Sequence, residues 1–72
     1  MEYNYNKLKG RIVEKCGNQE TFASMMDLSP RTISLKLNNK IDWRQSEIMK
    51  ACEVLEITSN QIKVYFFELD VQ

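Results

Sequence analysis

The chain has 72 residues, of which 43% are hydrophobic and 28% are charged, and this is the composition of a small globular domain rather than of a disordered segment. It contains no histidine, which excludes histidine acid–base chemistry and histidine metal ligands. Its two cysteines, Cys16 and Cys52, form no CxxC motif and so give no support for a zinc or thiol-redox site. We expect no enzymatic activity, no metal and no cofactor.

The apolar segments are short. No apolar run exceeds four residues, so the sequence predicts no membrane span. The first residues, MEYNYNKLKGR, lack the apolar region of a signal peptide. With two glycines and one proline, no flexible linker or low-complexity tract is expected. We therefore expect one soluble domain over residues 1–72, in a reducing, cytoplasmic compartment and without an effector-binding domain.

The charge sums to zero but is unevenly distributed. Residues 1–40 contain seven basic and four acidic residues, a net of +3, whereas residues 41–72 contain three basic and six acidic residues, a net of −3. This division would let the first half face an anionic partner while the second half keeps the molecule soluble. Small proteins also acquire such a division by chance, so it indicates nucleic acid only together with a motif.

Apolar residues recur with helical spacing from the N-terminus onward. A first helix is predicted to end at Gly17, because glycine is the usual residue after a helix C-terminus. Asn18 is predicted to cap a second helix of about two turns that ends near Asp27. The residues of these two helices expected to face inward are Tyr5, Leu8, Ile12, Cys16, Phe22, Ala23 and Met26.

Ser29 and Pro30 give the sharpest local signal. Serine suits a helix N-cap and proline suits the first helical position, where no N–H is needed. A third helix is predicted from Pro30 to about Asn38, with Ile33 and Leu37 facing inward. The pair Asn38–Asn39 is expected to end it, because asparagine tolerates a left-handed conformation.

Asp42 is predicted to cap a fourth helix from Trp43 to about Leu55, and Thr58 to cap a fifth. No stretch alternates with period two, so strands are not expected. The sequence therefore predicts an all-α, compact five-helix domain. The inward residues of its last two helices and of their connection are expected to be Ile48, Ala51, Cys52, Leu55, Ile57, Ile62, Tyr65 and Phe66.

Two short helices joined by a tight turn, as expected over residues 19–38, suggest a helix-turn-helix. Gln19 opens the first of them, and Ala23 is small where the two must approach closely. Asp27 falls at the turn position that requires a left-handed residue. The outer face of the second helix is polar, with hydroxyl groups and two cations.

The stretch QETFASMMDLSPRTISLKLNNK, residues 19–40, resembles the lambda-repressor-like (Cro-type, XRE-like) helix-turn-helix family of phage and bacterial regulators. The five-helix interpretation extends this resemblance over roughly residues 5–67. The sequence departs from the family at Asp27, where glycine is usual, and at Lys36, which occupies an often apolar position. The zero net charge is a third departure and predicts modest non-specific affinity for DNA.

The resemblance implies that the helix from Pro30 enters the major groove of double-stranded DNA. Arg31 is then the best base reader, because its fork matches guanine, and Leu35 would meet a thymine methyl group. Alternatively, these side chains could face solvent or pack within the fold without contacting DNA. Base-reading positions are thus Ser29, Pro30, Arg31, Ser34 and Leu35, and DNA-backbone positions are Gln19, Thr32, Lys36, Asn39, Lys40 and Arg44.

Two functions from different classes fit these features. The first is a phage or prophage Cro-like repressor that acts by occupying an operator, without a small-molecule effector. The alternative is a helix-turn-helix protein-interaction module, such as an antirepressor or antitoxin-like partner, without its own DNA site. The acidic second half and the apolar run at residues 65–67 favour this alternative.

The first hypothesis also requires a dimer, because one helix reads too few base pairs to select a site in a genome. We expect a weak homodimer that binds a two-fold operator. Its contact is predicted at Phe67, Leu69 and Val71, since the C-terminal segment has more apolar side chains than one helix face buries. The alternative is that this tail folds back onto its own domain.

Overall fold

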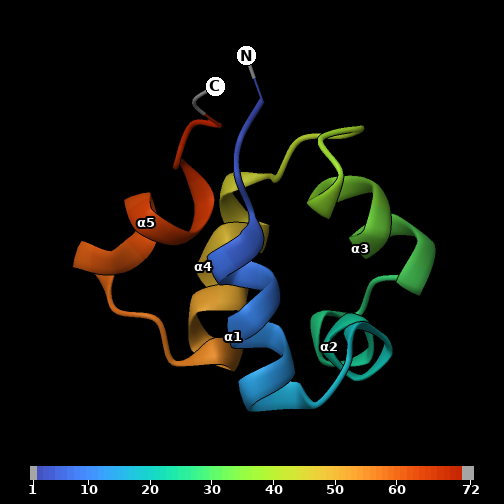
Figure 1. Cartoon of the computed structure of the whole chain (residues 1–72). Helices are drawn as coiled ribbons and strands as arrows, with labels where there is room; N and C mark the ends of the chain where they lie inside the picture. The colour runs from blue at the N-terminus through green and yellow to red at the C-terminus, as the bar shows by residue number, and fades with distance from the viewer. Residues whose placement is uncertain (1, 71–72) are drawn as a thin grey trace.

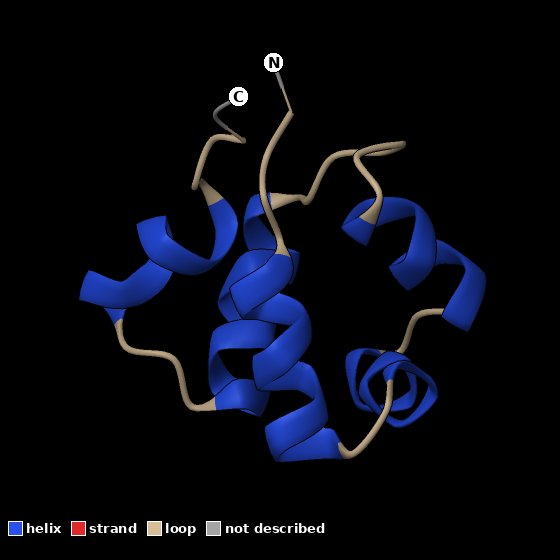
Figure 2. Ribbon diagram, in the orientation of Figure 1, coloured by secondary structure: helices blue, strands red, loops and turns tan. Residues whose placement is uncertain are grey.

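The computed structural model describes residues 2–70 and confirms the all-α fold class. Its helices are α1 (Asn6–Cys16), α2 (Gln19–Met26), α3 (Pro30–Leu37), α4 (Gln45–Leu55), a 3₁₀ turn η1 (Ser59–Gln61) and α5 (Ile62–Phe66). Helices α1 and α4 lie in the middle, with α2 and α3 on one side and α5 on the other (Figures 1 and 2). In the described part of the chain, every helix falls short of the length and apolar character that a membrane span requires.

The ends of α1, α2 and α3 follow the predicted capping residues. Gly17 ends α1 with φ of +88°, and Asp27 ends α2 in the left-handed conformation with φ of +58°. Asn18 caps α2, since its Oδ1 accepts the Thr21 N–H at 2.7 Å. After α3, Asn39 has φ of +61°, as predicted for the asparagine pair.

The start of α4 differs from the prediction, and the cap assigned to Asp42 is wrong. Helix α4 begins at Gln45 and its N-cap is Arg44, whose N–H is accepted by Glu47 Oε1 at 2.8 Å. Residues 42–44 lie outside the helix, and there the Trp43 ring packs edge-on against Phe66, with centroids 5.3 Å apart. A helix starting at Trp43 would have lost the capping contact that Glu47 supplies at the third helical position.

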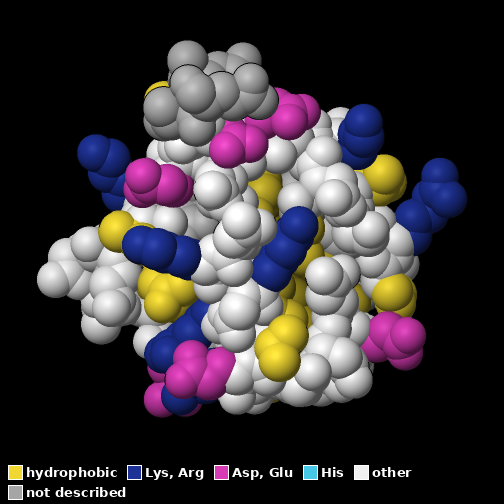
Figure 3. Space-filling model, in the orientation of Figure 1, with side chains coloured by type: hydrophobic (Ala, Val, Ile, Leu, Met, Phe, Trp, Pro, Cys, Tyr) yellow, Lys and Arg dark blue, Asp and Glu magenta, His cyan; other side chains and the backbone are white. Residues whose placement is uncertain are grey.

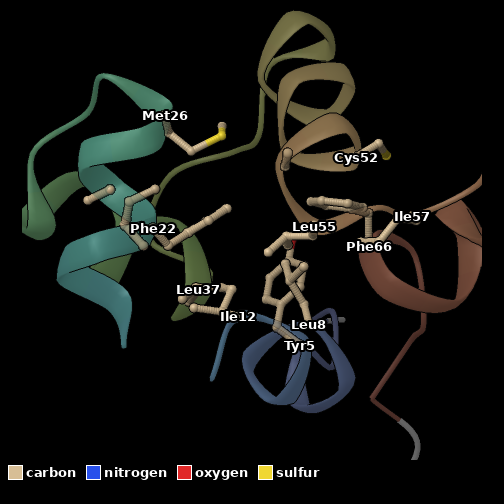
Figure 4. Packing of buried hydrophobic residues seen from close by; sticks show 13 residues of the cluster. Tyr5, Leu8, Ile12, Phe22, Met26, Leu37, Cys52, Leu55, Ile57 and Phe66 are labelled. Atoms are coloured by element: carbon tan, nitrogen blue, oxygen red, sulfur yellow. The ribbon is translucent and has the colours of Figure 1, made fainter. Parts of the chain in front are cut away.

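One hydrophobic core holds the described elements together, and it contains most residues predicted to face inward. Figure 4 shows Leu8, Leu55 and Phe66 entering the same interior from α1, α4 and α5. The buried apolar residues are Tyr5, Leu8, Ile12, Phe22, Ala23, Met26, Ile33, Leu37, Ala51, Cys52, Leu55, Ile57 and Phe66. Four others predicted to face inward are half-buried at its margin, namely Cys16, Ile48, Ile62 and Tyr65.

Arg11 ties α1 to the C-terminal end of α4. Its Nε donates to the carbonyl of Leu55 at 2.8 Å, and its Nη2 donates to the carbonyl of Glu56 at 3.1 Å. The last carbonyls of a helix have no partner within the helix, so a cation placed there satisfies them and complements the helix dipole. The contact fixes the two central helices relative to each other.

The two ends of the described chain lie side by side (Figure 1). The N–H of Asn4 donates to the carbonyl of Glu68 at 2.7 Å, and that of Asp70 donates to the carbonyl of Glu2 at 2.8 Å. An isolated antiparallel bridge between Tyr3 and Leu69 lies between these bonds. Residues 2–4 and 68–70 thus form a short two-stranded closure of the helical fold.

Replacing Ile33 with alanine tests the core assignment of α3. Ile33 is fully buried, so Ile33→Ala should lower the free energy of unfolding by about 2–5 kcal/mol through lost burial and a residual cavity. The measurement is urea denaturation followed by circular dichroism. The matched control is Ser34→Ala on the exposed side of α3, which should unfold close to the wild-type midpoint. Equal midpoints for the two variants would contradict the packing described here.

Candidate functional site

The candidate site is the outward side of α3, which follows α2 after the turn at residues 27–29. Pro30, Arg31 and Ser34 are exposed, and Leu35 is half-buried. We call these four residues the α3 outer face. The structure therefore brings four of the five predicted base-reading residues onto one accessible surface.

Ser29, the fifth of these residues, serves the fold directly. Its hydroxyl accepts the N–H of Thr32 at 3.1 Å and donates to Thr32 Oγ1 at 2.9 Å. Both hydroxyl groups are thus held by the N-terminal cap of α3, as the Ser–Pro signal predicts. Thr32, predicted as a DNA-backbone contact, is half-buried beside it.

The assignment of Lys36 as a DNA-backbone contact is wrong, because its side chain is only 4% exposed. Its ammonium group lies 2.7 Å from Glu47 Oε1 and donates to the main-chain carbonyl of Asp42 at 2.8 Å. It also lies 5.8 Å from the centre of the Trp43 ring. Position 36 lies three residues after the buried Ile33, so helical geometry turns it toward the interior.

The pairing with Lys36 also changes the pKa of Glu47. Burial acts to raise the pKa of Glu47, but the hydrogen bond from Lys36, the N–H of Arg44 and the positive charges of both residues together hold this pKa below its ordinary value. Glu47 is therefore ionised near neutral pH and balances the buried charge of Lys36. Removing either partner of such a buried pair destabilises the fold, because it leaves the charge of the other partner uncompensated.

The remaining predicted DNA-backbone residues have different surroundings. Gln19, Lys40 and Arg44 are exposed. Asn39 is held within the fold, since its Oδ1 accepts the N–H of Tyr3 at 3.1 Å and its Nδ2 donates to the carbonyl of Tyr3 at 2.9 Å. The Arg44 N–H donates to Glu47 Oε1 at 2.8 Å within the cap of α4, so this amide is not free for a phosphate.

With Lys36 neutralised, Arg31 is the one exposed cation that α3 carries. A DNA-binding surface obtains much of its affinity from several lysines and arginines placed against phosphates. Lys50 on α4 is also partly neutralised, because its Nζ lies 3.4 Å from Asp27 Oδ2. The charge around the α3 outer face is therefore weaker than the excess of basic residues in the first half of the sequence suggests.

The residues predicted to form a dimer lie at the paired chain ends. Phe67 and Leu69 are 44% and 45% exposed, and the Phe67 ring contacts Tyr3 edge-on at 5.9 Å between centroids. Residues 68–70 pair with residues 2–4 of the same chain, which is the alternative arrangement considered for the tail. Val71 lies outside the described residues. The homodimer stays a prediction.

Sequence reasoning missed three features near this region. It did not place Lys36 in the interior, although the step of three from Ile33 and its often apolar position both indicated burial. It did not find the contact of Arg11 with the end of α4, which no local pattern encodes. It also gave no role to Tyr3, whose ring meets Phe67 only through the closure of the chain ends.

Comparison with known proteins identifies the class of this chain. A family model described as Protein of unknown function (DUF739) matches residues 1–69, and the chain belongs to this family. A search of curated proteins returned no match. Among solved structures, the chain is similar to the solution structure of the modulator of repression (MOR) of the temperate bacteriophage TP901-1 from Lactococcus lactis.

The similarity to this modulator extends over the whole molecule. The two sequences are 51% identical, the TM-score is 0.83, and the match covers 100% of this chain and 97% of the other. The similar protein is described as a modulator of repression, not as a repressor. The prediction that this chain is an operator-occupying, DNA-binding repressor is therefore wrong, and the alternative of a regulatory partner protein agrees better with the comparison.

The buried pair between Lys36 and Glu47 can be tested by single and double substitution. Glu47→Gln leaves the Lys36 charge without its partner and should lower the free energy of unfolding by about 3 kcal/mol. The double variant Lys36→Met/Glu47→Gln removes both charges at similar volume and should recover most of that loss. Chemical denaturation of the wild type and both variants measures the effect. A double variant less stable than Glu47→Gln would contradict this account.

The same pair predicts an acid dependence of stability. Because the pKa of Glu47 is lower in the folded chain than its ordinary value of 4.5, ionised Glu47 stabilises the fold above that pH. The contribution should fade as the pH drops below 4.5 and through the folded pKa. Unfolding free energies of the wild type and Glu47→Gln, measured from neutral to acidic pH, should therefore converge. A difference that persists at the acidic end would exclude this origin.

Proposed function

We propose that this chain is a regulatory partner protein that binds a transcriptional repressor and changes its activity. The observation that carries the proposal is the 51% identity, over the full chain, to a phage modulator of repression. Such identity at full coverage supports a related role in controlling repression. The partner would then be a protein, and operator DNA would be the partner's ligand.

We further propose that α2 and α3 form a lambda-repressor-like helix-turn-helix whose outer side contacts protein. The left-handed turn at Asp27 and the Ser29–Pro30 start of α3 support the motif. The weak positive charge supports the protein contact, because Lys36 is buried against Glu47. A fold of this kind does not determine its ligand, so the ligand must be inferred from the side chains on its surface.

The α3 outer face has the mixed character of a protein interface. Pro30 and Leu35 are apolar, and Arg31 supplies one cation. Arginine is enriched at protein–protein interfaces, whereas a DNA-binding surface is strongly basic. We therefore assign the α3 outer face as the principal contact with the repressor.

The test uses the repressor of phage TP901-1 and a reporter gene under its operator. Expression of this chain should change reporter activity only in cells that contain the repressor, and the two purified proteins should associate in calorimetry. Arg31→Ala should weaken that association about tenfold, or about 1.4 kcal/mol. The matched control is Lys63→Ala, which removes an exposed cation from α5.

Two results would contradict the proposal. One is a sequence-specific shift of operator DNA by this chain alone. The other is an unchanged reporter together with no association between the purified proteins. If Arg31→Ala and Lys63→Ala bind the repressor with equal affinity, the α3 outer face is not the principal contact.

A further inference from the structure

A concave site separate from the residues of the α3 outer face lies where the N-terminal segment meets the start of α4 and the end of α5. Its volume is about 230 Å³. Sites for drug-sized ligands and cofactors measure roughly 300–1,000 Å³, so this one fits a single side chain better. We call it the aromatic pocket, and its lining residues are Tyr3, Tyr5, Asp42, Trp43, Ile48, Phe66 and Phe67.

Two pairs of rings in this pocket stand at nearly right angles, whereas the rings of Tyr3 and Tyr5 are tilted at 42° to each other. Tyr3 and Phe67 meet at 83° with centroids 5.9 Å apart, and Trp43 and Phe66 meet at 81° with centroids 5.3 Å apart. The two rings of each perpendicular pair form adjoining walls of the pocket. The face of an aromatic ring carries partial negative charge and attracts a cation within about 6 Å of its centre, most strongly for tryptophan.

A carboxylate completes the pocket. Asp42 is exposed and belongs to the lining. The pKa of Tyr5 is raised, first by burial, then by Tyr3 and then by the charge of Asp42. The Asp42 carboxylate therefore acts electrostatically on a buried wall of the pocket. Because Asp42 does not cap α4, its side chain is available to a ligand.

Further carboxylates surround the same end of the molecule. Glu2, Glu68 and Asp70 lie in the paired segments that carry Tyr3 and Leu69. Figure 3 shows acidic side chains gathered beside the two chain ends. Within residues 2–70, neither these three carboxylates nor that of Asp42 takes part in an ion pair. The surroundings of the pocket are therefore complementary to a positive charge.

The cations near the pocket do not supply that charge. Lys36 lies 5.8 Å from the centre of the Trp43 ring, but its ammonium group is held by Glu47 at 2.7 Å. Lys9 lies in a neighbouring polar hollow that Glu2 and Asp70 also line. Neither residue is among those that line the aromatic pocket.

We propose that the aromatic pocket binds the side chain of an arginine presented by a protein partner. A guanidinium group is planar, stacks on aromatic faces and is weakly hydrated, and its fork of donors matches a carboxylate such as that of Asp42. An ammonium group is a more strongly hydrated point charge and fits such walls less well. The inference relies on the proposed function only for the partner being a protein.

The test uses this chain and the peptide acetyl-Gly-Arg-Gly-amide, with no repressor present. Trp43 is the only tryptophan, so its fluorescence and its indole N–H resonance report directly on the pocket. The arginine peptide should produce a saturable change in both signals. The same peptide with citrulline, which is neutral and of similar shape, or with lysine should bind at least fivefold more weakly.

Variants separate charge recognition from changes in the fold. Asp42→Asn should weaken binding of the arginine peptide about fivefold, while the main-chain carbonyl that accepts from Lys36 is retained. Phe67→Ala removes an exposed wall and should weaken binding similarly, with circular dichroism showing an intact fold. Glu53→Gln, which removes an exposed carboxylate on α4 outside the pocket, should bind like the wild type.

Three outcomes would overturn the inference. They are no saturable signal with the arginine peptide, equal binding of the citrulline or lysine peptide, and equal binding by Asp42→Asn and the wild type. Because the assay contains no repressor, its result is independent of the proposed function. If this chain binds the arginine peptide but does not bind the repressor, only the proposed function is refuted.

Discussion

The ion pair between Lys36 and Glu47 is the interaction on which the second half of the molecule depends. It connects the inner side of α3 to the first turn of α4, and the same ammonium group holds the carbonyl of Asp42. The chain from residue 42 to residue 44 is thereby fixed outside the helix, where Trp43 reaches Phe66. One buried charge thus sets the start of α4, a wall of the aromatic pocket and the low positive charge of the α3 outer face.

This arrangement explains how a chain that resembles a DNA-binding family can serve a different partner. The features that build the two short helices are local, namely the caps at Asn18 and Ser29 and the turn at Asp27. The features that attract DNA are cations on the surface, and they can be lost without disturbing those caps. Burying Lys36 against Glu47 keeps the helix pair and removes one of the charges that would meet a phosphate.

The sequence was sufficient for most features that follow from local chemistry, although it misplaced the N-cap of α4. Helical spacing predicts the buried residues of α1 and α2, and Gly17, Asp27 and Asn39 adopt the positive φ values that their residue types favour. It was insufficient where the outcome depends on residues far apart, such as Arg11 reaching the end of α4. Function was harder still, because the motif indicates a scaffold, whereas the ligand depends on which of its charges remain exposed.

The pairing of residues 2–4 with residues 68–70 has a consequence for the order of folding. These segments are separated by nearly the whole chain, and such a contact yields its energy only after the intervening helices are ordered. The closure therefore forms late, and it can open locally while the core between α1 and α4 stays intact. Since Tyr3 lies in this closure and Phe67 directly precedes it, local opening would displace two walls of the aromatic pocket without unfolding the whole domain.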